Sequence, residues 1–184
     1  LVLRLTADRP GAITGWISAA SEQDNRVAIE NGELLLRGRN GTRFGIEGRL
    51  RFTLRSRVQA AGGRVDDMGG RVRLENVDEL VLIAAAATSY VRHDDVSGDP
   101  DAITAARVQA AARKSWATLR DAHVREHQRL FRRVHLDLGR TEVAARSTEV
   151  RVERFATQDD PALAALYFQF GRYLLIASSR PGTQ

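Results

Sequence analysis

The sequence predicts an antiparallel β-sandwich followed by an α-helical segment. Two patterns along the chain carry this prediction. Up to residue 92, apolar residues alternate with polar ones and turn signals recur at short intervals, which is typical of strands joined by hairpins. Beyond Asp94 the apolar residues recur at steps of three and four, which is typical of helices. We therefore expect residues 1–93 to form the sandwich and the following residues to be helical.

The clearest strand is predicted over residues 43–58. Its even positions are mostly apolar and its odd positions mostly arginine, so the strand should have one buried and one solvated face. Gly45 and Gly48 within it indicate a bulge or a close approach of two backbone segments. Earlier in the chain, Asn31 and Gly32 separate two apolar runs and predict a tight hairpin.

Two helical segments are predicted by the same start signal. Asp99-Pro100 and Asp160-Pro161 each place a good N-cap before a proline that suits the first helical position. The first segment runs to about Val134, and its length favours a break into two helices. The second, residues 161–177, is apolar on both faces and should be buried inside a large body. Residues 137–150 are polar and are expected to form a linker.

Composition and charge argue against several classes of protein. The 184 residues carry a net charge of +5, but the arginines are spread among acidic residues, which argues against nucleic-acid binding. The absence of Cys removes disulfide and thiolate chemistry. No apolar stretch approaches the ~20 residues that cross a membrane, so no membrane partner is expected. The compartment, cytoplasmic or secreted, stays undetermined, because a signal peptide would precede Leu1.

Four stretches resemble glycoside hydrolase family 95, the α-L-fucosidase family, and occur in that family's order. They are residues 7–11 (ADRPG), 88–90 (TSY) with 95–100 (DVSGDP), 123–139 (from HVREHQ to LDLG), and 159–184 (DDPALAALYFQFGRYLLIASSRPGTQ). The resemblance implies an N-terminal β-sandwich over residues 1–93, a helical linker over residues 94–150, and the first helix of an (α/α)6 barrel over residues 151–184. It also implies that the chain is a fragment of a longer enzyme.

The resemblance implies a parent enzyme that releases terminal α-linked L-fucose from glycans by an inverting acid/base mechanism, without metal or cofactor. The family's acid and base correspond to no position here, so we expect no catalytic residue in this chain. We expect the chain to be an inactive scaffold when alone, with the missing catalytic barrel as its intramolecular partner. Thr183 and Gln184 begin a loop that runs near the mouth of the barrel in that family, and they are the residues expected nearest to the substrate.

A zinc site is an alternative interpretation of the motif H-x-x-E-H. His123 and His127 lie four residues apart on one helix face, so both imidazoles could reach one Zn²⁺, with Glu126 as the base. A third ligand would have to come from Glu149 or Glu153. Both histidines also lie on the apolar stripe of the predicted helix, and we favour packing over metal binding.

Two further functions stay open at this point. One is another sandwich-plus-barrel glycosidase or phosphorylase, and the other is a non-catalytic carbohydrate-binding or interaction module. Six carboxylates in the linker or at a helix start are expected to be exposed and are given no catalytic role: Asp137, Glu142, Glu149, Glu153, Asp159 and Asp160. Trp16 and Trp116 have the chemistry to stack on sugars, but we interpret both as core residues.

Overall fold

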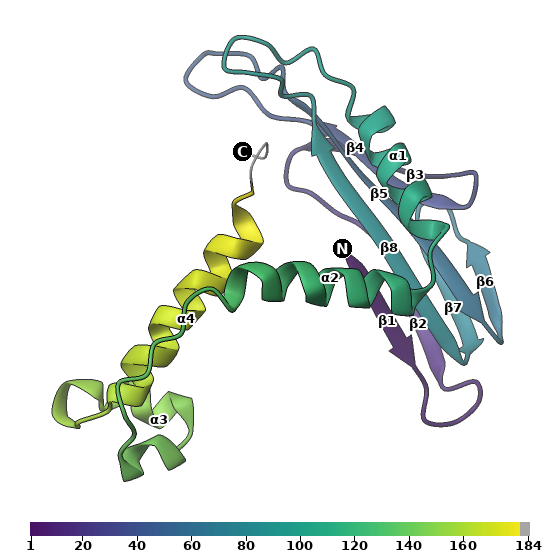
Figure 1. The fold of residues 1–184 in the computed structure, drawn as a ribbon. Helices are drawn as coiled ribbons and strands as arrows, with labels where there is room; N and C mark the ends of the chain where they lie inside the picture. The colour runs from purple at the N-terminus through teal and green to yellow at the C-terminus, as the bar shows by residue number, and fades with distance from the viewer. Residues whose placement is uncertain (181–184) are drawn as a thin grey trace. The chain divides into compact units, whose positions relative to one another are not determined.

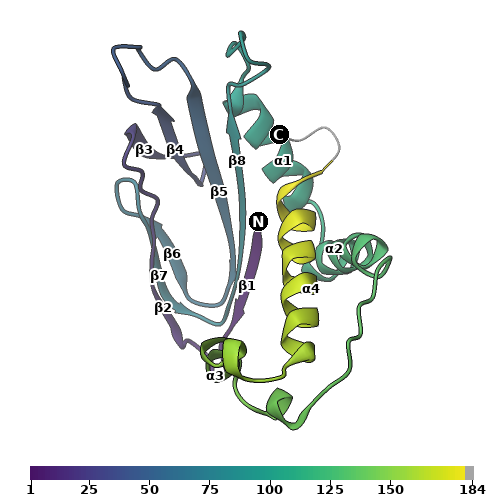
Figure 2. The ribbon, with the colours of Figure 1, turned by 90° about the vertical axis from the view of Figure 1, so that its left-hand side faces the viewer.

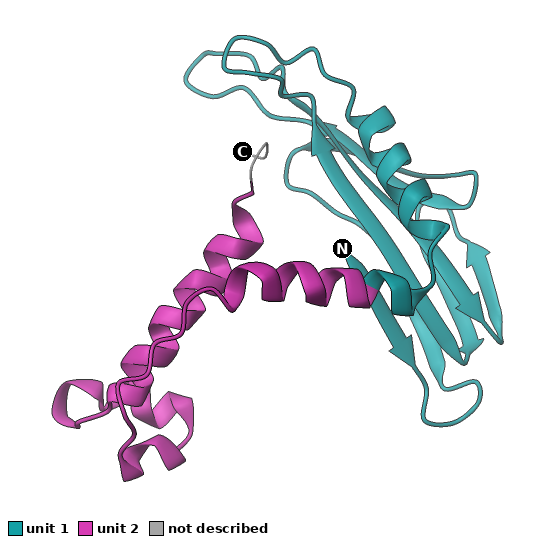
Figure 3. Cartoon of the chain, in the orientation of Figure 1, with its two compact units in different colours: residues 1–119 teal, residues 120–184 magenta. Residues whose placement is uncertain are grey.

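The structure is a computed structural model that describes residues 1–180. These residues contain eight β-strands and four α-helices, as Figure 1 shows. The chain divides into two compact units, residues 1–119 and residues 120–184, which are coloured separately in Figure 3. The first unit contains all the strands and the first helix, and the second contains most of the second helix and everything after it.

The first unit is built on two antiparallel sheets. The larger has the strand order β1-β8-β5-β4-β3 and the smaller the order β2-β7-β6. Figure 2 shows the two sheets as separate layers. The strands are β1 (Val2–Thr6), β2 (Ile13–Ile17), β3 (Asp24–Glu30), β4 (Glu33–Arg39), β5 (Arg51–Ala61), β6 (Arg64–Asp67), β7 (Val72–Val77) and β8 (Glu79–Thr88). The predicted antiparallel sandwich is confirmed.

Apolar side chains between the sheets form the core of this unit. Leu34 and Leu80 of the larger sheet cluster with Val72, Leu74 and Val77 of the smaller one. The exposed fraction of each is 6 % or less. Successive side chains of a strand point to opposite faces, so the alternating sequence pattern delivers these residues to one interior.

The predicted hairpin at Asn31 and Gly32 is confirmed. β3 and β4 pair up to Glu30 and Glu33, which leaves a two-residue turn between them. Asn31 has φ 53° and Gly32 has φ 75°. A tight turn of this kind needs positive φ at both central residues, which asparagine and glycine tolerate best.

The predicted start of the strand at residue 43 is wrong, because β5 begins at Arg51. Arg43 and Ile46 instead close a separate tight turn, each donating its backbone N–H to the other's carbonyl oxygen at 3.0 Å. Phe44 at the tip has φ 52° and a side chain that is 91 % exposed. The backbone turns here, and the period-two pattern therefore runs through residues that are not in the sheet.

Gly48 marks a close approach of two backbone segments, as its position in the sequence suggested. A Cβ at Gly48 would collide with the carbonyl oxygen of Asn40. The backbone N–H of Asn40 donates to the carbonyl oxygen of Leu50 at 3.0 Å, so the two segments are also joined by a hydrogen bond.

We expect Gly48→Ala to lower the free energy of unfolding by about 1–3 kcal/mol in a urea titration. Gly41→Ala is the control, because a Cβ there would lie 3.7 Å from the nearest atom, Gln23 Oε1. Equal losses in the two variants would contradict the close approach.

Helix α1 (Pro100–Ala112) packs on the face of the larger sheet that points away from the smaller sheet (Figure 2). The Asp99 carboxylate accepts a hydrogen bond from the N–H of Ala102 at 3.1 Å, which confirms the predicted N-cap. Asp101 in the first turn accepts from Arg37 of β4 at 2.8 Å. Val108 of α1 is fully buried, so apolar burial and an ion pair both hold α1 on the sheet.

The predicted break in the long helical segment is confirmed, because three residues separate the end of α1 from the start of α2 (Trp116–Phe131). The second unit continues with the 3₁₀ turn η1 (Glu142–Ala145), α3 (Thr148–Glu153), the 3₁₀ turn η2 (Phe155–Thr157) and α4 (Pro161–Ser178). The start of α4 at Pro161 agrees with the sequence. The division into domains at residues 93 and 150 stays a prediction. Across residues 1–180, every helix is too short or too polar to cross a membrane.

Candidate functional site

The N-terminus of α4 is fixed by a buried ion pair. The Asp160 carboxylate accepts hydrogen bonds from Arg151 Nε at 2.8 Å and from Arg151 Nη2 at 3.0 Å. It also accepts from the N–H of Leu163 at 3.0 Å, so the predicted N-cap is confirmed. The hydrogen bonds from Arg151 hold the pKa of Asp160 below its usual value.

The expectation that Asp160 is exposed is wrong, since its side chain is 0 % exposed. A carboxylate tolerates burial when it is ionised and paired, and Arg151 supplies a two-pronged partner. The other five carboxylates of that group, Asp137, Glu142, Glu149, Glu153 and Asp159, are exposed as expected.

Arg172 joins α4 to the end of α2. Its guanidinium donates to the carbonyl oxygens of Phe131 at 2.8 Å, Val134 at 2.8 Å and Leu130 at 3.3 Å. The last carbonyls of a helix lack partners within the helix, so Arg172 caps α2 from a neighbouring element. The same guanidinium lies 5.0 Å from the centroid of the Phe131 ring. Sequence reasoning missed this role, although a lone arginine in a strongly apolar helix is a signal.

We expect Arg172→Lys to loosen the contact between α4 and the end of α2. A lysine keeps the charge but lacks the planar fork that reaches three carbonyls together. Amide hydrogen exchange in residues 130–134 should be at least about 5-fold faster, the effect of losing roughly one net hydrogen bond.

Arg129→Lys is the matched control, because Arg129 pairs with Glu126 on the exposed surface of α2. Unchanged exchange in Arg172→Lys would show that the carbonyls of α2 do not depend on this fork.

The two histidines of the H-x-x-E-H motif belong to a row of stacked rings. His127 stacks on Phe131 with centroids 5.1 Å apart, and Tyr173 of α4 meets it edge-on at 6.0 Å. His123 lies 6.4 Å from His127. Within residues 1–180, no three or more His, Cys, Asp or Glu side chains gather as a metal site would require. Glu149 and Glu153 therefore do not lie in such a group with His123 and His127.

Apolar side chains of α4 are widely exposed in the described chain. Only Leu163 of this helix is buried, whereas Tyr167 is 76 % and Leu175 64 % exposed. The α4 surface, as we call it, consists of Leu166, Tyr167, Phe168, Phe170, Tyr173, Leu174 and Leu175. An apolar patch of this kind marks a site of interaction with another surface. A hollow of about 430 Å³ beside it is lined by Val152, Phe155, Leu163, Ala164 and Tyr167.

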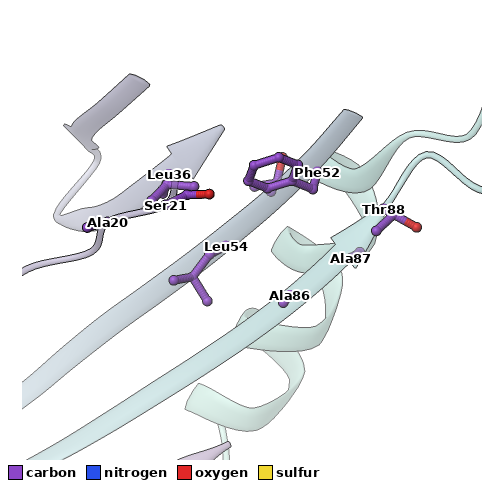
Figure 4. Close-up of a pocket in the computed structure, with 9 residues that line it drawn as sticks. Ala20, Ser21, Leu36, Phe52, Leu54, Ala86, Ala87 and Thr88 are labelled. Carbon is purple, nitrogen blue, oxygen red and sulfur yellow. The ribbon is translucent and has the colours of Figure 1, made fainter. Parts of the chain in front are cut away.

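The sandwich has a separate hollow of about 420 Å³, which Figure 4 shows. Its lining is mostly apolar and comes from β4, β5, β8 and residues 20–21: Ala20, Ser21, Leu36, Phe52, Thr53, Leu54, Ala86, Ala87 and Thr88. No carboxylate or imidazole is among these side chains, so the hollow offers no acid or base. Thr183 and Gln184, the residues expected nearest to the substrate, lie outside the described residues.

Two protein families match separate parts of the chain. Residues 1–93 match the N-terminal domain of glycosyl hydrolase family 65, and residues 115–184 match the catalytic domain of glycosyl hydrolase family 95. A protein named alpha-L-fucosidase 2, from Arabidopsis thaliana, is 31 % identical over the whole of this chain. The chain belongs to glycoside hydrolase family 95. The resemblance seen in its four sequence stretches is thereby confirmed.

A second relative of this family 95 chain is named probable alpha-fucosidase A, from Aspergillus niger, and is 31 % identical over 59 % of the chain. The chain spans 25 % of the Arabidopsis protein, and the match to the Aspergillus protein covers 15 % of that protein. The Arg151–Asp160 pair, Arg172 and the α4 surface all lie in the part that matches the family 95 catalytic domain.

Proposed function

We propose that this family 95 chain is the scaffold of an enzyme that removes terminal α-linked L-fucose from glycans. It supplies a β-sandwich over residues 1–93, a helical linker over residues 94–150, and the first helix of a catalytic barrel over residues 151–184. The names of both relatives support the fucosidase activity. The α4 surface carries the scaffold role, because its exposed aromatic and aliphatic side chains need a large apolar partner.

The catalytic acid and base are inferred to come from outside this chain. Inverting hydrolysis needs two carboxyl groups about 6.5–9.5 Å apart, with room for a water and the sugar between them. The two buried carboxylates among residues 1–180, Glu33 and Asp160, are both held by arginines. Hydrogen bonds from Arg151 hold the pKa of Asp160 below its usual value, so this carboxylate is a poor proton donor. Together these observations favour a supporting role for the described residues.

The first test is an assay of the isolated chain on an aryl α-L-fucoside. We expect no turnover above that of a preparation from cells without the gene. Turnover that follows the pure protein through purification would contradict the scaffold role.

The second test is a chimera of the Arabidopsis relative in which the aligned quarter is replaced by this chain. We expect the folded chimera to hydrolyse the aryl α-L-fucoside, because the barrel would be supplied by the relative. The control is the same relative without the aligned quarter, which should be inactive. A folded chimera without activity would contradict the proposal that this chain completes a fucosidase.

The match of residues 1–93 to a family 65 domain favours a second candidate, another sandwich-plus-barrel glycosidase or phosphorylase. The whole reading frame would decide between the two. Its protein should be assayed on a set of aryl glycosides, with and without inorganic phosphate. Cleavage of the α-L-fucoside alone, independent of phosphate, supports the first proposal, and phosphate-dependent cleavage of another glycoside supports the second.

A further inference from the structure

The smaller sheet exposes a tryptophan on the face that points away from the core. Residues of β2 alternate in direction, so that Ile13 and Ile17 pack against the core while Trp16 points outward. The Trp16 side chain is 52 % exposed, and its interpretation as a core residue is wrong. Figure 2 shows α1 on the opposite side of the larger sheet, so the only helix wholly within the first unit leaves this face uncovered.

Charged side chains of both signs surround Trp16. Trp16 pairs in register with Arg73 of β7, and Arg73 pairs with Asp66 of β6, which places the three side chains in one row on the same face. The guanidinium of Arg71 lies 5.1 Å from the centroid of the Trp16 ring. We call this surface the Trp16 face, and its residues are Trp16, Arg64, Asp66, Arg71, Arg73 and Glu75.

Ion pairs join charged groups of opposite sign on the Trp16 face. Arg64 Nε lies 2.7 Å from Asp66 Oδ2, and Arg73 Nη2 lies 3.5 Å from Glu75 Oε2. The sheet therefore presents planar donors and planar acceptors next to each other, beside a rigid aromatic ring. Guanidinium groups supply N–H donors in a fork, and carboxylates supply pairs of acceptor oxygens.

This arrangement suits a pyranose ring better than it suits a nucleic acid or a protein partner. A pyranose has an apolar face of C–H groups, which can lie on an aromatic ring, and a rim of hydroxyls that both donate and accept. Nucleic acid would favour arginines without interleaved carboxylates, since phosphates dominate its binding. A protein hot spot also uses tryptophan and arginine, but aspartate and glutamate are depleted there, whereas this face contains Asp66 and Glu75.

We propose that the Trp16 face binds a pyranose unit of a neutral glycan. Trp16 stacks on the apolar face of the sugar, while Asp66, Glu75 and the neighbouring arginines contact its hydroxyls. The binding site goes beyond the proposed function and does not rest on it, because it needs neither a fucosidase activity nor a catalytic barrel.

The test is affinity electrophoresis of the 184-residue chain in native gels that contain a neutral polysaccharide, galactomannan or xyloglucan. We expect at least one of the two to retard the chain, and Trp16→Ala to weaken the apparent affinity roughly tenfold. Trp16→Phe should keep part of the retardation, because an aromatic face remains. Far-UV circular dichroism of each variant checks that the sheets are intact.

Phe44→Ala is the matched control, because Phe44 is also an exposed ring with an arginine above it, Arg43 at 5.3 Å, but lies on a loop tip. We expect this variant to be retarded like the parent chain. A gel with polygalacturonate, which is anionic, is a second control. It measures retardation that comes only from the attraction between a basic chain and an anion, and salt should weaken that attraction.

The proposal is overturned if neither neutral polysaccharide retards the chain, if Trp16→Ala is retarded as strongly as the parent, or if Phe44→Ala loses as much. Retardation by polygalacturonate alone would also overturn it, in favour of unspecific anion binding. None of these outcomes bears on fucosidase activity, which the chimera assay measures separately.

Discussion

Leu34→Ala is expected to lower the free energy of unfolding of the sandwich unit by about 2–5 kcal/mol. Leu34 is 2 % exposed and packs from β4, which is paired on both sides, against side chains of the smaller sheet. Removal of its three distal carbons costs the transfer free energy of those carbons and leaves a cavity that a strand held on both edges cannot easily close. Urea titration followed by circular dichroism in the β-sheet region measures the loss.

Leu3→Ala is the control for this prediction, because it deletes the same atoms from a leucine that is 42 % exposed on the edge strand β1. We expect it to cost less than about 1 kcal/mol. A double variant with Leu74→Ala adds a stricter test, since residues in contact couple by about 0.5 kcal/mol or more. Similar losses at Leu34 and Leu3, or strict additivity with Leu74, would contradict a core that joins the two sheets.

The sequence was most informative where a local signal and the periodicity agreed. Asn31 and Gly32 lie between two alternating runs, and the structure has a two-residue turn there. Asp99 and Asp160 precede prolines, and both cap the helix that follows. The prediction failed over residues 43–50, where the alternation continues but the backbone turns at Phe44. Alternation of apolar and polar residues indicates a buried face only while the chain stays in a sheet. A turn closed by backbone hydrogen bonds does not require a change in the alternation, so the sequence pattern does not show where the turn lies.

The candidate site was less predictable, because its polar contacts join residues that are distant in sequence. Arg172 reaches carbonyls about 40 positions earlier, and its place as a lone arginine in an apolar helix signals a polar role without indicating those partners. Trp16 is a different case. Ile13 and Ile17 lie an odd number of positions from it, so a period of two already places Trp16 on the opposite face. We interpreted Trp16 as a core residue because of its size, although the alternation favours the surface position that the structure shows.

Asp160→Ala is expected to have the largest effect in the helical unit. The change leaves the Arg151 guanidinium buried without its carboxylate and removes the N-cap of α4 in one step. Breaking one side of a buried pair typically shifts an unfolding equilibrium by roughly 100-fold or more. Helical circular dichroism during urea titration measures the shift. Asp159→Ala is the control, because Asp159 is its exposed neighbour and its carboxylate has no part in the cap.

The pKa of Asp160 gives this prediction a direction in pH. Hydrogen bonds from Arg151 lower the folded-state pKa, so the ionised pair stabilises the fold above the unfolded-state pKa of about 3.9. That stabilisation is lost as pH falls through the lower, folded-state pKa. The stability difference between the parent chain and Asp160→Asn should therefore be full at pH 6 and shrink below about pH 4.

Comparing the two proteins cancels the other carboxylates whose pKa is lowered, such as Glu126 beside Arg129, because both proteins contain them. Asp160→Asn also keeps an oxygen that can accept from the N–H of Leu163, so its loss relative to the parent reports mainly on the charge. A difference that stays constant between pH 6 and pH 3 would mean that Asp160 contributes as a cap and not as the anion of a buried pair. The fixed start of α4 would then rest on its backbone geometry rather than on Arg151.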